Sequence, residues 1–172
     1  KYAAERFAIM YNLYHGTKIA VVRAMNGYGE GQHHAPIRKV VPNFILPALK
    51  NEEILIYGDG EQKIDVIYVK DAVEILSRAL LNNHNLYNTV IEAGTGKPIT
   101  VNYLANLIIR MTKSKSKKKY TKMRNGEPFR SITKADAKTL KPLKFTGKYF
   151  TPLKKGIKRT ISWYKKHLKE FS

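Results

Sequence analysis

The sequence predicts a mixed α/β fold, and three observations support that prediction. Stretches with apolar residues at helical spacing alternate with short β-branched runs, as in proteins that cover a sheet with helices. The apolar run at 19–22 is continuous, which is typical of a strand covered on both faces in a parallel sheet. Hydrophobic residues make up 43% of the 172 residues, which is enough to build a core and too much for a disordered chain.

The first half of the chain is predicted to alternate helices and strands from its first residue. Phe7, Tyr11 and Tyr14 lie four and three residues apart, on one face of a helix that ends at Gly16. Pro47 is expected to kink or shorten a helix at 39–50, because proline lacks a backbone donor. The predicted elements are a helix at 1–15, a strand at 18–23, an irregular loop at 26–36, a helix at 39–50, and strands at 53–57 and 64–69.

The second half is predicted to hold further helices and a lysine-rich segment. Thr100 can cap a helix whose apolar residues are Leu104, Leu107 and Ile108. Residues 113–119 form a low-complexity lysine block that we expect to be solvated. The predicted elements are a helix at 70–82, a strand at 87–91, a turn at 94–98, a helix that begins after 100, a strand at 120–123, and helices at 134–140 and 152–168.

The formal net charge is +19, and it is concentrated in the last third of the chain. Residues 1–109 hold 11 basic and 10 acidic residues, whereas residues 110–172 hold 21 basic and 3 acidic residues. Such a surplus suggests a polyanion or nucleic-acid partner, but lysine outnumbers arginine 24 to 8 and no aromatic residue interrupts 113–119. We therefore expect most of this charge to be solvated surface, and we keep polyanion or nucleic-acid binding as an alternative function.

Composition excludes several classes of site. The chain has no cysteine, which rules out disulfides, cysteine-ligated zinc and thiol catalysis. No apolar run approaches the roughly 18–20 residues of a membrane span, so no membrane segment is expected. His33 and His34 are adjacent and have no carboxylate at ligand spacing, so no metal site is expected.

Several segments rich in glycine and polar residues are candidates for ligand contacts, and each has an ordinary structural alternative. Asn26 follows the strand at 18–23, and ligands of α/β proteins bind at the carboxyl ends of strands. The segment 57–71 holds a Gly-Asp-Gly turn whose backbone N–H groups can bind oxygens, although it also fits a simple connection between strands. Arg124, beside a glycine-containing turn, suits a bidentate phosphate contact or a solvated loop. The segment 94–97 lacks the spacing of a phosphate-binding loop and is predicted to be a turn.

In this order, these segments resemble one family. Residues 1–5 are similar to the segment that begins at the lysine of a Tyr-x-x-x-Lys motif, and 23–32 to R-x-x-N-x-Y-G-P-G-Q, with Glu30 in place of proline. Residues 56–71 resemble Y-G-D-G-x-Q-x-R-D-x-I-Y-V-x-D, and 124–128 resemble R-P-G-E-P. The chain thus resembles the C-terminal part of the extended short-chain dehydrogenases/reductases, the NAD-dependent nucleotide-sugar epimerases and dehydratases.

The resemblance implies an architecture. It predicts the C-terminal part of a NAD(P)-binding Rossmann-like fold together with a small mixed α/β substrate-binding domain. Residues 1–35 would end the Rossmann core, and 36–172 would form the substrate-binding portion, with 64–81 returning to the core. The N-terminal dinucleotide-binding half, with its glycine-rich loop and catalytic tyrosine, would lie outside this chain, so the chain alone is expected to be inactive. A truncated, non-catalytic module is therefore a further alternative.

The resemblance also implies roles for particular residues. In this family NAD oxidises a sugar hydroxyl to a transient 4-keto intermediate, and a lysine beside the catalytic tyrosine favours the tyrosinate. Lys1 matches that lysine, as a catalytic and cofactor-binding residue, and Ala24 matches a cofactor-binding position. The implied substrate-binding residues are Asn26, Lys39, Val40, Ile56, Tyr57, Arg124 and Glu127.

One position departs from the family pattern. Ile64 stands where the family usually has an arginine that contacts phosphate. Lys63 is not expected to replace that arginine, because neighbouring residues on a strand point to opposite faces. The pose of the substrate diphosphate and the identity of the substrate are therefore left open. By resemblance we also expect a cytoplasmic homodimer that pairs through the helix at 1–15.

Overall fold

A computed structural model describes residues 1–37, 39–81, 86–87 and 89–171. Within them the helices are α1 (Tyr2–His15), α2 (Val40–Lys50), α3 (Val69–Leu81), α4 (Val101–Thr112) and α5 (Leu153–Lys166), with 3-10 helices η1 (Ala137–Leu143), η2 (Gly147–Tyr149) and η3 (Leu168–Phe171). The strands are β1 (Val21–Ala24), β2 (Asn26–Tyr28), β3 (Ile54–Tyr57), β4 (Lys63–Ile64), β5 (Val66–Tyr68), β6 (Val90–Ala93), β7 (Ile99–Thr100) and β8 (Lys118–Thr121). None of the described helices is long and apolar enough to cross a bilayer.

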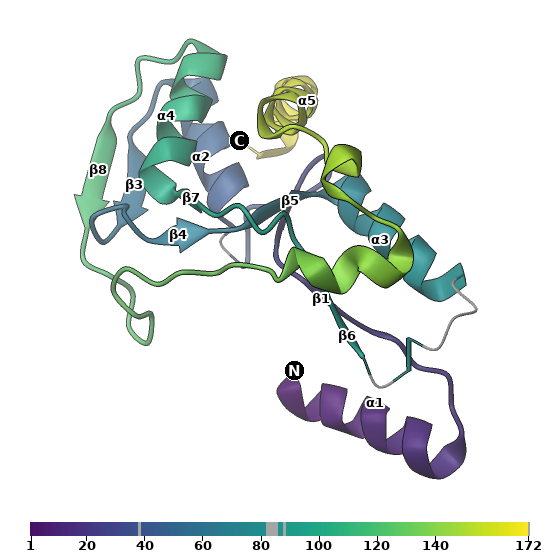
Figure 1. The fold of residues 1–172 in the computed structure, drawn as a ribbon. Helices are drawn as coiled ribbons and strands as arrows, with labels where there is room; N and C mark the ends of the chain where they lie inside the picture. The colour runs from purple at the N-terminus through teal and green to yellow at the C-terminus, as the bar shows by residue number, and fades with distance from the viewer. Residues whose placement is uncertain (38, 82–85, 88, 172) are drawn as a thin grey trace.

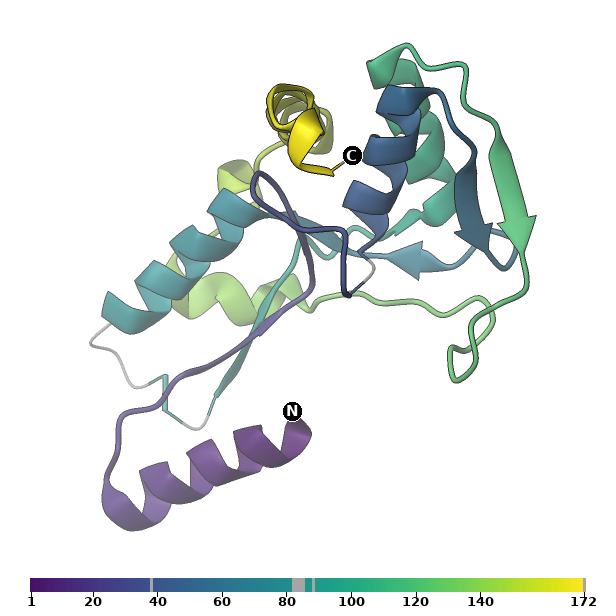
Figure 2. The ribbon, with the colours of Figure 1, turned by 180° about the vertical axis from the view of Figure 1, so that it is seen from behind.

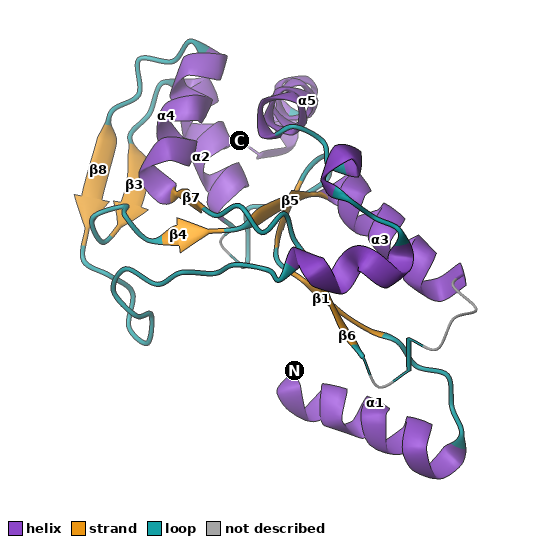
Figure 3. Cartoon of the chain, in the orientation of Figure 1, coloured by secondary structure: helices purple, strands orange, loops and turns teal. Residues whose placement is uncertain are grey.

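The elements form two groups, with β5 between them (Figures 1 and 3). One group contains α2, α4, β3 and β8, and the other contains α3, β1, β6 and η1. Parallel pairing joins β1 to β6, β2 to β5 and β3 to β8, whereas β4 and β7 pair antiparallel. The predicted mixed α/β class is therefore confirmed. Among the described residues, β1 pairs with β6 alone.

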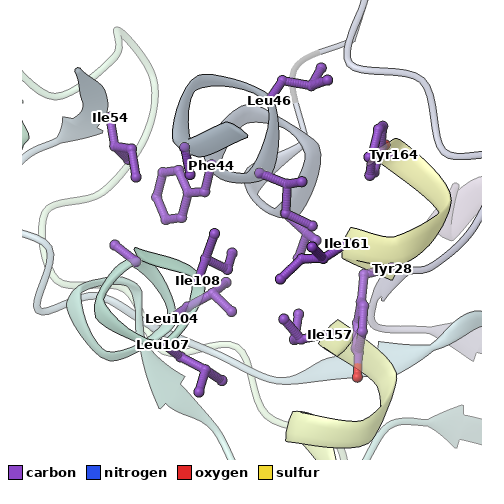
Figure 4. Packing of buried hydrophobic residues seen from close by; sticks show 14 of the residues in the cluster. Tyr28, Phe44, Leu46, Ile54, Leu104, Leu107, Ile108, Ile157, Ile161 and Tyr164 are labelled. Atoms are coloured by element: carbon purple, nitrogen blue, oxygen red, sulfur yellow. The ribbon is translucent and has the colours of Figure 1, made fainter. Parts of the chain in front are cut away.

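Two hydrophobic clusters stabilise these groups. The larger cluster joins α2, α4 and α5 to β2, β3 and β5, and Figure 4 shows Phe44, Ile108 and Ile161 converging from the three helices. The smaller cluster joins α3, β6 and η1 to a single residue of β5, Ile67. Side chains alternate across a strand, so Tyr68, the next residue, packs into the larger cluster. The strand β5 thus contributes to both cores.

The predicted strand at 64–69 is interrupted at Asp65, which separates β4 from β5. The Asp65 side chain is fully buried, and its carboxylate accepts four hydrogen bonds. The donors are the Thr95 N–H at 3.0 Å, the Thr95 hydroxyl at 2.6 Å, the Gly96 N–H at 2.8 Å and the Ala135 N–H at 3.1 Å. A buried charge needs such partners. The segments around Thr95 and Ala135 supply them at the point where the strand is interrupted.

Two stretches expected to lack regular structure are partly strands. The predicted loop at 26–36 begins with β2, whose residues pair with β5 from Asn26↔Val66 to Tyr28↔Tyr68. The lysine block at 113–119 ends in β8, where Lys118 and Lys119 pair with β3, but its lysine side chains are mostly exposed, as expected. The loop prediction failed at 26–28 and the strand predicted at 120–123 begins two residues earlier, because pairing uses backbone groups, which glycine-rich or lysine-rich composition does not remove.

Other differences concern boundaries. Pro47 does not shorten α2, which continues to Lys50, and the Pro47 carbonyl accepts the Glu52 N–H at 2.9 Å. The predicted helix at 134–140 is the 3-10 helix η1, which begins after Asp136 caps Lys138. The strand expected at 87–91 is β6, a few residues later, and residues 82 and 88 lie outside the described residues. Thr100 caps α4 as predicted, accepting the Tyr103 N–H at 3.0 Å.

Helix α1 lies apart from the larger cluster in both views (Figures 1 and 2). None of its residues is buried, and its large exposed side chains include Phe7 and Tyr14. It is tied to the sheet by Arg23, which contacts Glu5 of α1 at 2.6 Å and Glu92 of β6 at 3.4 Å. The Arg23 guanidinium holds the pKa of the Glu5 carboxyl below its usual value.

Candidate functional site

A cavity of about 400 Å³ opens where α2, the carboxyl end of β3, β4 and the segment 124–131 meet. This volume is in the usual range of small-molecule sites. Its lining combines cations, amides, two carboxylates and apolar side chains. The lining residues are Asn26, Lys39, Val40, Asn43, Phe44, Pro47, Glu53, Leu55, Ile56, Tyr57, Gln62, Ile64, Val101, Arg124, Glu127 and Ser131.

One face of α2 forms a wall of this cavity. Lys39, Val40, Asn43, Phe44 and Pro47 recur at helical spacing, so they lie on the same side of the helix. Lys39 is the N-cap residue, in an extended conformation, and its carbonyl accepts the Asn43 side-chain amide at 2.8 Å. The lysine charge and the positive end of the helix dipole therefore act at the same place, which favours an anion in the cavity.

Arg124 supplies a second cation from the segment after β8. Its guanidinium lies over the Tyr57 ring, 4.9 Å from the centroid, and forms an ion pair with Glu127 at 2.7 Å. The Glu127 N–H also donates to the Arg124 carbonyl at 3.1 Å, so the two residues form a turn. The aromatic ring and the Glu127 carboxylate together position the guanidinium at the cavity. A guanidinium has five N–H donors, so this ion pair leaves donors for a ligand.

The far end of the same segment is tied to the glycine turn after β3. Arg130 forms an ion pair with Asp59 at 2.8 Å. The backbone N–H of Glu61 and the Arg130 guanidinium hold the pKa of the Asp59 carboxyl below its usual value. These contacts keep the segment that carries Arg124 against β3, and thus keep the cation beside the cavity.

Asn26 reaches the cavity from β2. Its backbone N–H and its side-chain amide both donate to the Asp65 carbonyl, at 3.2 and 3.1 Å. The buried Asp65 side chain described above fixes that carbonyl. The position of Asn26 therefore depends on the break between β4 and β5.

The structure brings together all seven residues that the sequence suggested for the substrate. Those residues are Asn26, Lys39, Val40, Ile56, Tyr57, Arg124 and Glu127. Lys1 and Ala24 do not line the cavity: each is exposed, the first beside the start of α1 and the second at the carboxyl end of β1. The roles of all these residues are still predictions.

The position that departs from the family pattern also lies at the cavity. Ile64 is among the lining residues, and its neighbour Lys63 is not. This agrees with the expectation that Lys63 does not take the place of the missing arginine. Lys39 and Arg124 are thus the described cations of the cavity lining.

Sequence reasoning missed several lining residues. Asn43, Phe44 and Pro47 follow from Lys39 by helical periodicity, so the sequence held a signal for them. Gln62 lies before β4 and outside the strand predicted at 64–69, so strand alternation gave no signal for it. Nothing in the sequence near Ser131 indicated that it lines the cavity. Ser131 is held there by a long-range hydrogen bond, in which the Lys63 N–H donates to the Ser131 carbonyl.

Two other sequence motifs have structural roles here. The segment 94–97, predicted to be a turn, supplies the Thr95 and Gly96 N–H groups that donate to the Asp65 carboxylate. His33 and His34 pack against Phe171, with ring centroids 5.8 and 5.7 Å away. The described residues contain no group of three histidine, aspartate or glutamate side chains arranged to hold a metal ion.

The fold and the cavity define an α/β protein whose strand and helix ends are suited to an anionic small molecule. The sequence model of the NAD dependent epimerase/dehydratase family matches residues 1–94. The chain therefore belongs to the NAD-dependent epimerase/dehydratase family.

Curated relatives support this membership. A putative UDP-glucose 4-epimerase from Methanocaldococcus jannaschii is 35% identical over 168 residues, which are 96% of this chain and 52% of that protein. A UDP-N-acetyl-alpha-D-glucosaminuronate decarboxylase from Bacillus cytotoxicus is 31% identical over 87% of this chain and 47% of that protein. The chain spans about half the length of these relatives.

Solved structures share the fold. The UDP-glucose 4-epimerase of Thermotoga maritima, in a structure with UDP-glucose, superposes with a TM-score of 0.89 and 31% identity, over 98% of this chain and 52% of that one. A UDP-glucuronic acid 4-epimerase from Bacillus cereus, in complex with UDP-glucuronic acid and NAD, gives a TM-score of 0.86 over 97% of this chain and 51% of that one. Its identity is 22%, so that likeness concerns the fold alone.

Proposed function

We propose that the protein is a NAD-dependent epimerase or dehydratase of nucleotide-diphosphate sugars that works through a transient 4-keto intermediate. In this proposal the chain is the C-terminal, substrate-binding half of the enzyme and is inactive by itself. Family membership supports the reaction class. The relatives named as UDP-sugar epimerases and decarboxylases support the substrate class.

The observation that carries the proposal is the convergence of the implied substrate residues on one cavity. A nucleotide sugar has a diphosphate, which needs cations and donors, flanked by a ribose and a base. Lys39 and Arg124 would hold the diphosphate together with Asn26, and the Glu127 carboxylate would accept a ribose hydroxyl. Ile56 and Tyr57, at the end of β3, would lie beside the base.

We propose that NAD binds at the carboxyl end of β1. Ala24 is exposed there and is small, so it leaves room for a dinucleotide, and strand ends are the usual sites for such ligands. Bound NAD would supply the redox chemistry: a sugar carbon would lose a hydride to it and later regain that hydride. The exposed Lys1 ammonium would lower the pKa of a catalytic tyrosine phenol expected four residues before it, and would thereby keep that base ionised.

The domain division also belongs to this proposal. Residues 1–35 and 64–81 would join the dinucleotide-binding core, and the rest of 36–172 would form the substrate-binding portion. The aromatic, unburied surface of α1 supports pairing of two subunits through this helix. A cytoplasmic location, expected from the resemblance, is still a prediction.

Turnover by the full-length protein tests the proposed function. Incubation with NAD and a panel of UDP- and dTDP-sugars should give a C4 epimer or a keto sugar, detected by NMR of the products. Arg124→Ala should raise KM for the nucleotide sugar about tenfold or more, since a charge-assisted phosphate contact is lost. Lys154→Ala, which removes an exposed cation of α5, is the matched control and should leave KM unchanged. Absence of bound NAD together with absence of turnover on every sugar would refute the proposal.

The alternative of polyanion binding has one observation in its favour. The exposed residues of α5 and η3 form a basic surface. Its cations are Lys154, Lys155, Lys158, Arg159, Lys165, Lys166 and Lys169. If this surface binds nucleic acid, retention on immobilised DNA should fall steeply with salt, through counterion release. If retention at low salt does not exceed that of a neutral protein, this alternative is excluded.

A further inference from the structure

Gln62 is a cavity residue whose side chain is held in a defined position. It precedes β4 and shares the cavity face with Ile64, two residues later. Its backbone carbonyl accepts the Val101 N–H at 3.2 Å, and its side-chain Nε2 donates to the Tyr57 carbonyl at 2.8 Å. The first bond ties the Gln62 backbone to the start of α4, and the second holds its side chain at the end of β3.

The other end of the same amide lacks a partner. The Oε1 atom of Gln62 is buried and accepts no hydrogen bond from any residue that the structure describes. Turning the amide over would not help, because Oε1 would then face the Tyr57 carbonyl, which is also an acceptor. The neighbouring lining side chains of Ile64 and Val101 are apolar and have no donor to offer.

A buried acceptor without a donor is costly, and native structures rarely keep one without a reason. Here the acceptor belongs to a residue that lines a cavity, so a bound molecule that displaces the atoms covering Oε1 can supply the missing donor. We propose that Gln62 is a specificity-determining residue: its Oε1 accepts a hydrogen bond from the nucleotide part of the ligand. This inference rests on the proposed function, which places a nucleotide in the cavity.

Two groups of a uridine or thymidine nucleotide can donate this bond. One is the imide N–H of the base, and the other is a ribose hydroxyl. Cytosine carries a ring acceptor where uracil carries its imide N–H, so it would face Gln62 Oε1 with a second acceptor. A 2′-deoxyribose lacks one of the hydroxyl donors. The two sources can therefore be separated by the choice of nucleotide.

Calorimetric titration of the full-length protein with UDP, CDP and 2′-deoxy-UDP tests the proposal. If the base is the donor, the wild-type protein should bind UDP about tenfold more tightly than CDP, and Gln62→Met should reduce that ratio toward one. If the 2′-hydroxyl is the donor, the wild-type protein should bind UDP about tenfold more tightly than 2′-deoxy-UDP, and Gln62→Met should reduce that ratio of affinities toward one. Gln62→Met has a similar length but neither Oε1 nor Nε2.

Two further variants serve as controls. Gln32→Met changes another glutamine whose amide donates to a backbone carbonyl, that of Gly27 at 2.9 Å, but which does not line the cavity. It should leave both ratios unchanged. Gln62→Glu loses the Nε2 bond to the Tyr57 carbonyl, as Gln62→Met does, but keeps an oxygen acceptor. It should therefore retain more of the wild-type selectivity than Gln62→Met, and it covers the case in which Gln62→Met does not fold.

The outcomes separate this inference from the proposed function. Failure of the wild-type protein to bind any of the three nucleotides would count against the proposed function itself. If the wild-type protein and the folded Gln62 variants bind UDP with the same preference over CDP and over 2′-deoxy-UDP, the role of Gln62 is overturned and the proposed function is left intact.

Discussion

Replacing Asp65 by asparagine should destabilise the protein strongly, although the two side chains have nearly the same shape. The Asp65 carboxylate is fully buried and accepts two donors on each oxygen. An asparagine keeps one oxygen and turns an NH₂ group toward the other two donors. If the remaining oxygen faces Thr95, the N–H groups of Gly96 and Ala135 lose their acceptor.

The expected loss follows from those two donors. Each buried donor left without a partner costs about 1–3 kcal/mol, so Asp65→Asn should lower the free energy of unfolding by about 3–5 kcal/mol. Equilibrium urea unfolding, followed by circular dichroism, measures this difference. The matched control is Asp136→Asn, at an exposed residue whose side chain caps η1, and asparagine caps as well as aspartate. A loss below about 1 kcal/mol for Asp65→Asn would refute the assigned role of the carboxylate.

Three further predictions concern packing, capping and pH. Gly156→Ala should lower the free energy of unfolding by about 1–3 kcal/mol in urea titration, because the added Cβ would lie 2.3 Å from the Tyr28 hydroxyl oxygen. Thr100→Ala should cost about 1 kcal/mol, since it removes the N-cap of α4, whereas Thr100→Ser should be close to neutral. The ion pair of Glu5 with Arg23 lowers the folded-state pKa of Glu5, so its stabilisation is present above the unfolded value of about 4.5 and is lost as the pH falls through the folded value. Urea titrations between pH 7 and 3 should therefore show a smaller loss of stability for Glu5→Gln than for the wild type, and equal losses would contradict the pairing.

The sequence predicted most local elements of the fold but not their partners. The strands predicted at 18–23 and 53–57 correspond to β1 (Val21–Ala24) and β3 (Ile54–Tyr57), because β-branched residues favour extended backbone. The partner of β3 is β8, which overlaps the strand predicted at 120–123, but nothing in the sequence shows that residues 118–121 pair with residues 54–57. Similarly, nothing near Asp65 in the sequence shows that residues 95, 96 and 135 will surround its carboxylate.

The candidate site was predictable in outline for a different reason. Asn26 and Arg124 were candidates from their places after a strand and beside a turn, and the family resemblance added Lys39 and grouped all three into one site. Helical periodicity extends that set to Asn43 on the same face of α2. Neither approach predicts whether a buried acceptor has a hydrogen-bond donor. Gln62 Oε1 lacks one because none of the residues packed around it places a donor there, and that depends on the whole fold.

The alternating side chains of β5 have a consequence for how the chain unfolds. Ile67 packs in one hydrophobic cluster, and its neighbours Val66 and Tyr68 pack in the other. Melting either cluster would free the strand and expose the side chains it contributes to the second cluster. We therefore expect the two clusters to unfold as one cooperative unit, with coincident transitions whether the probe reports on α3 or on α4.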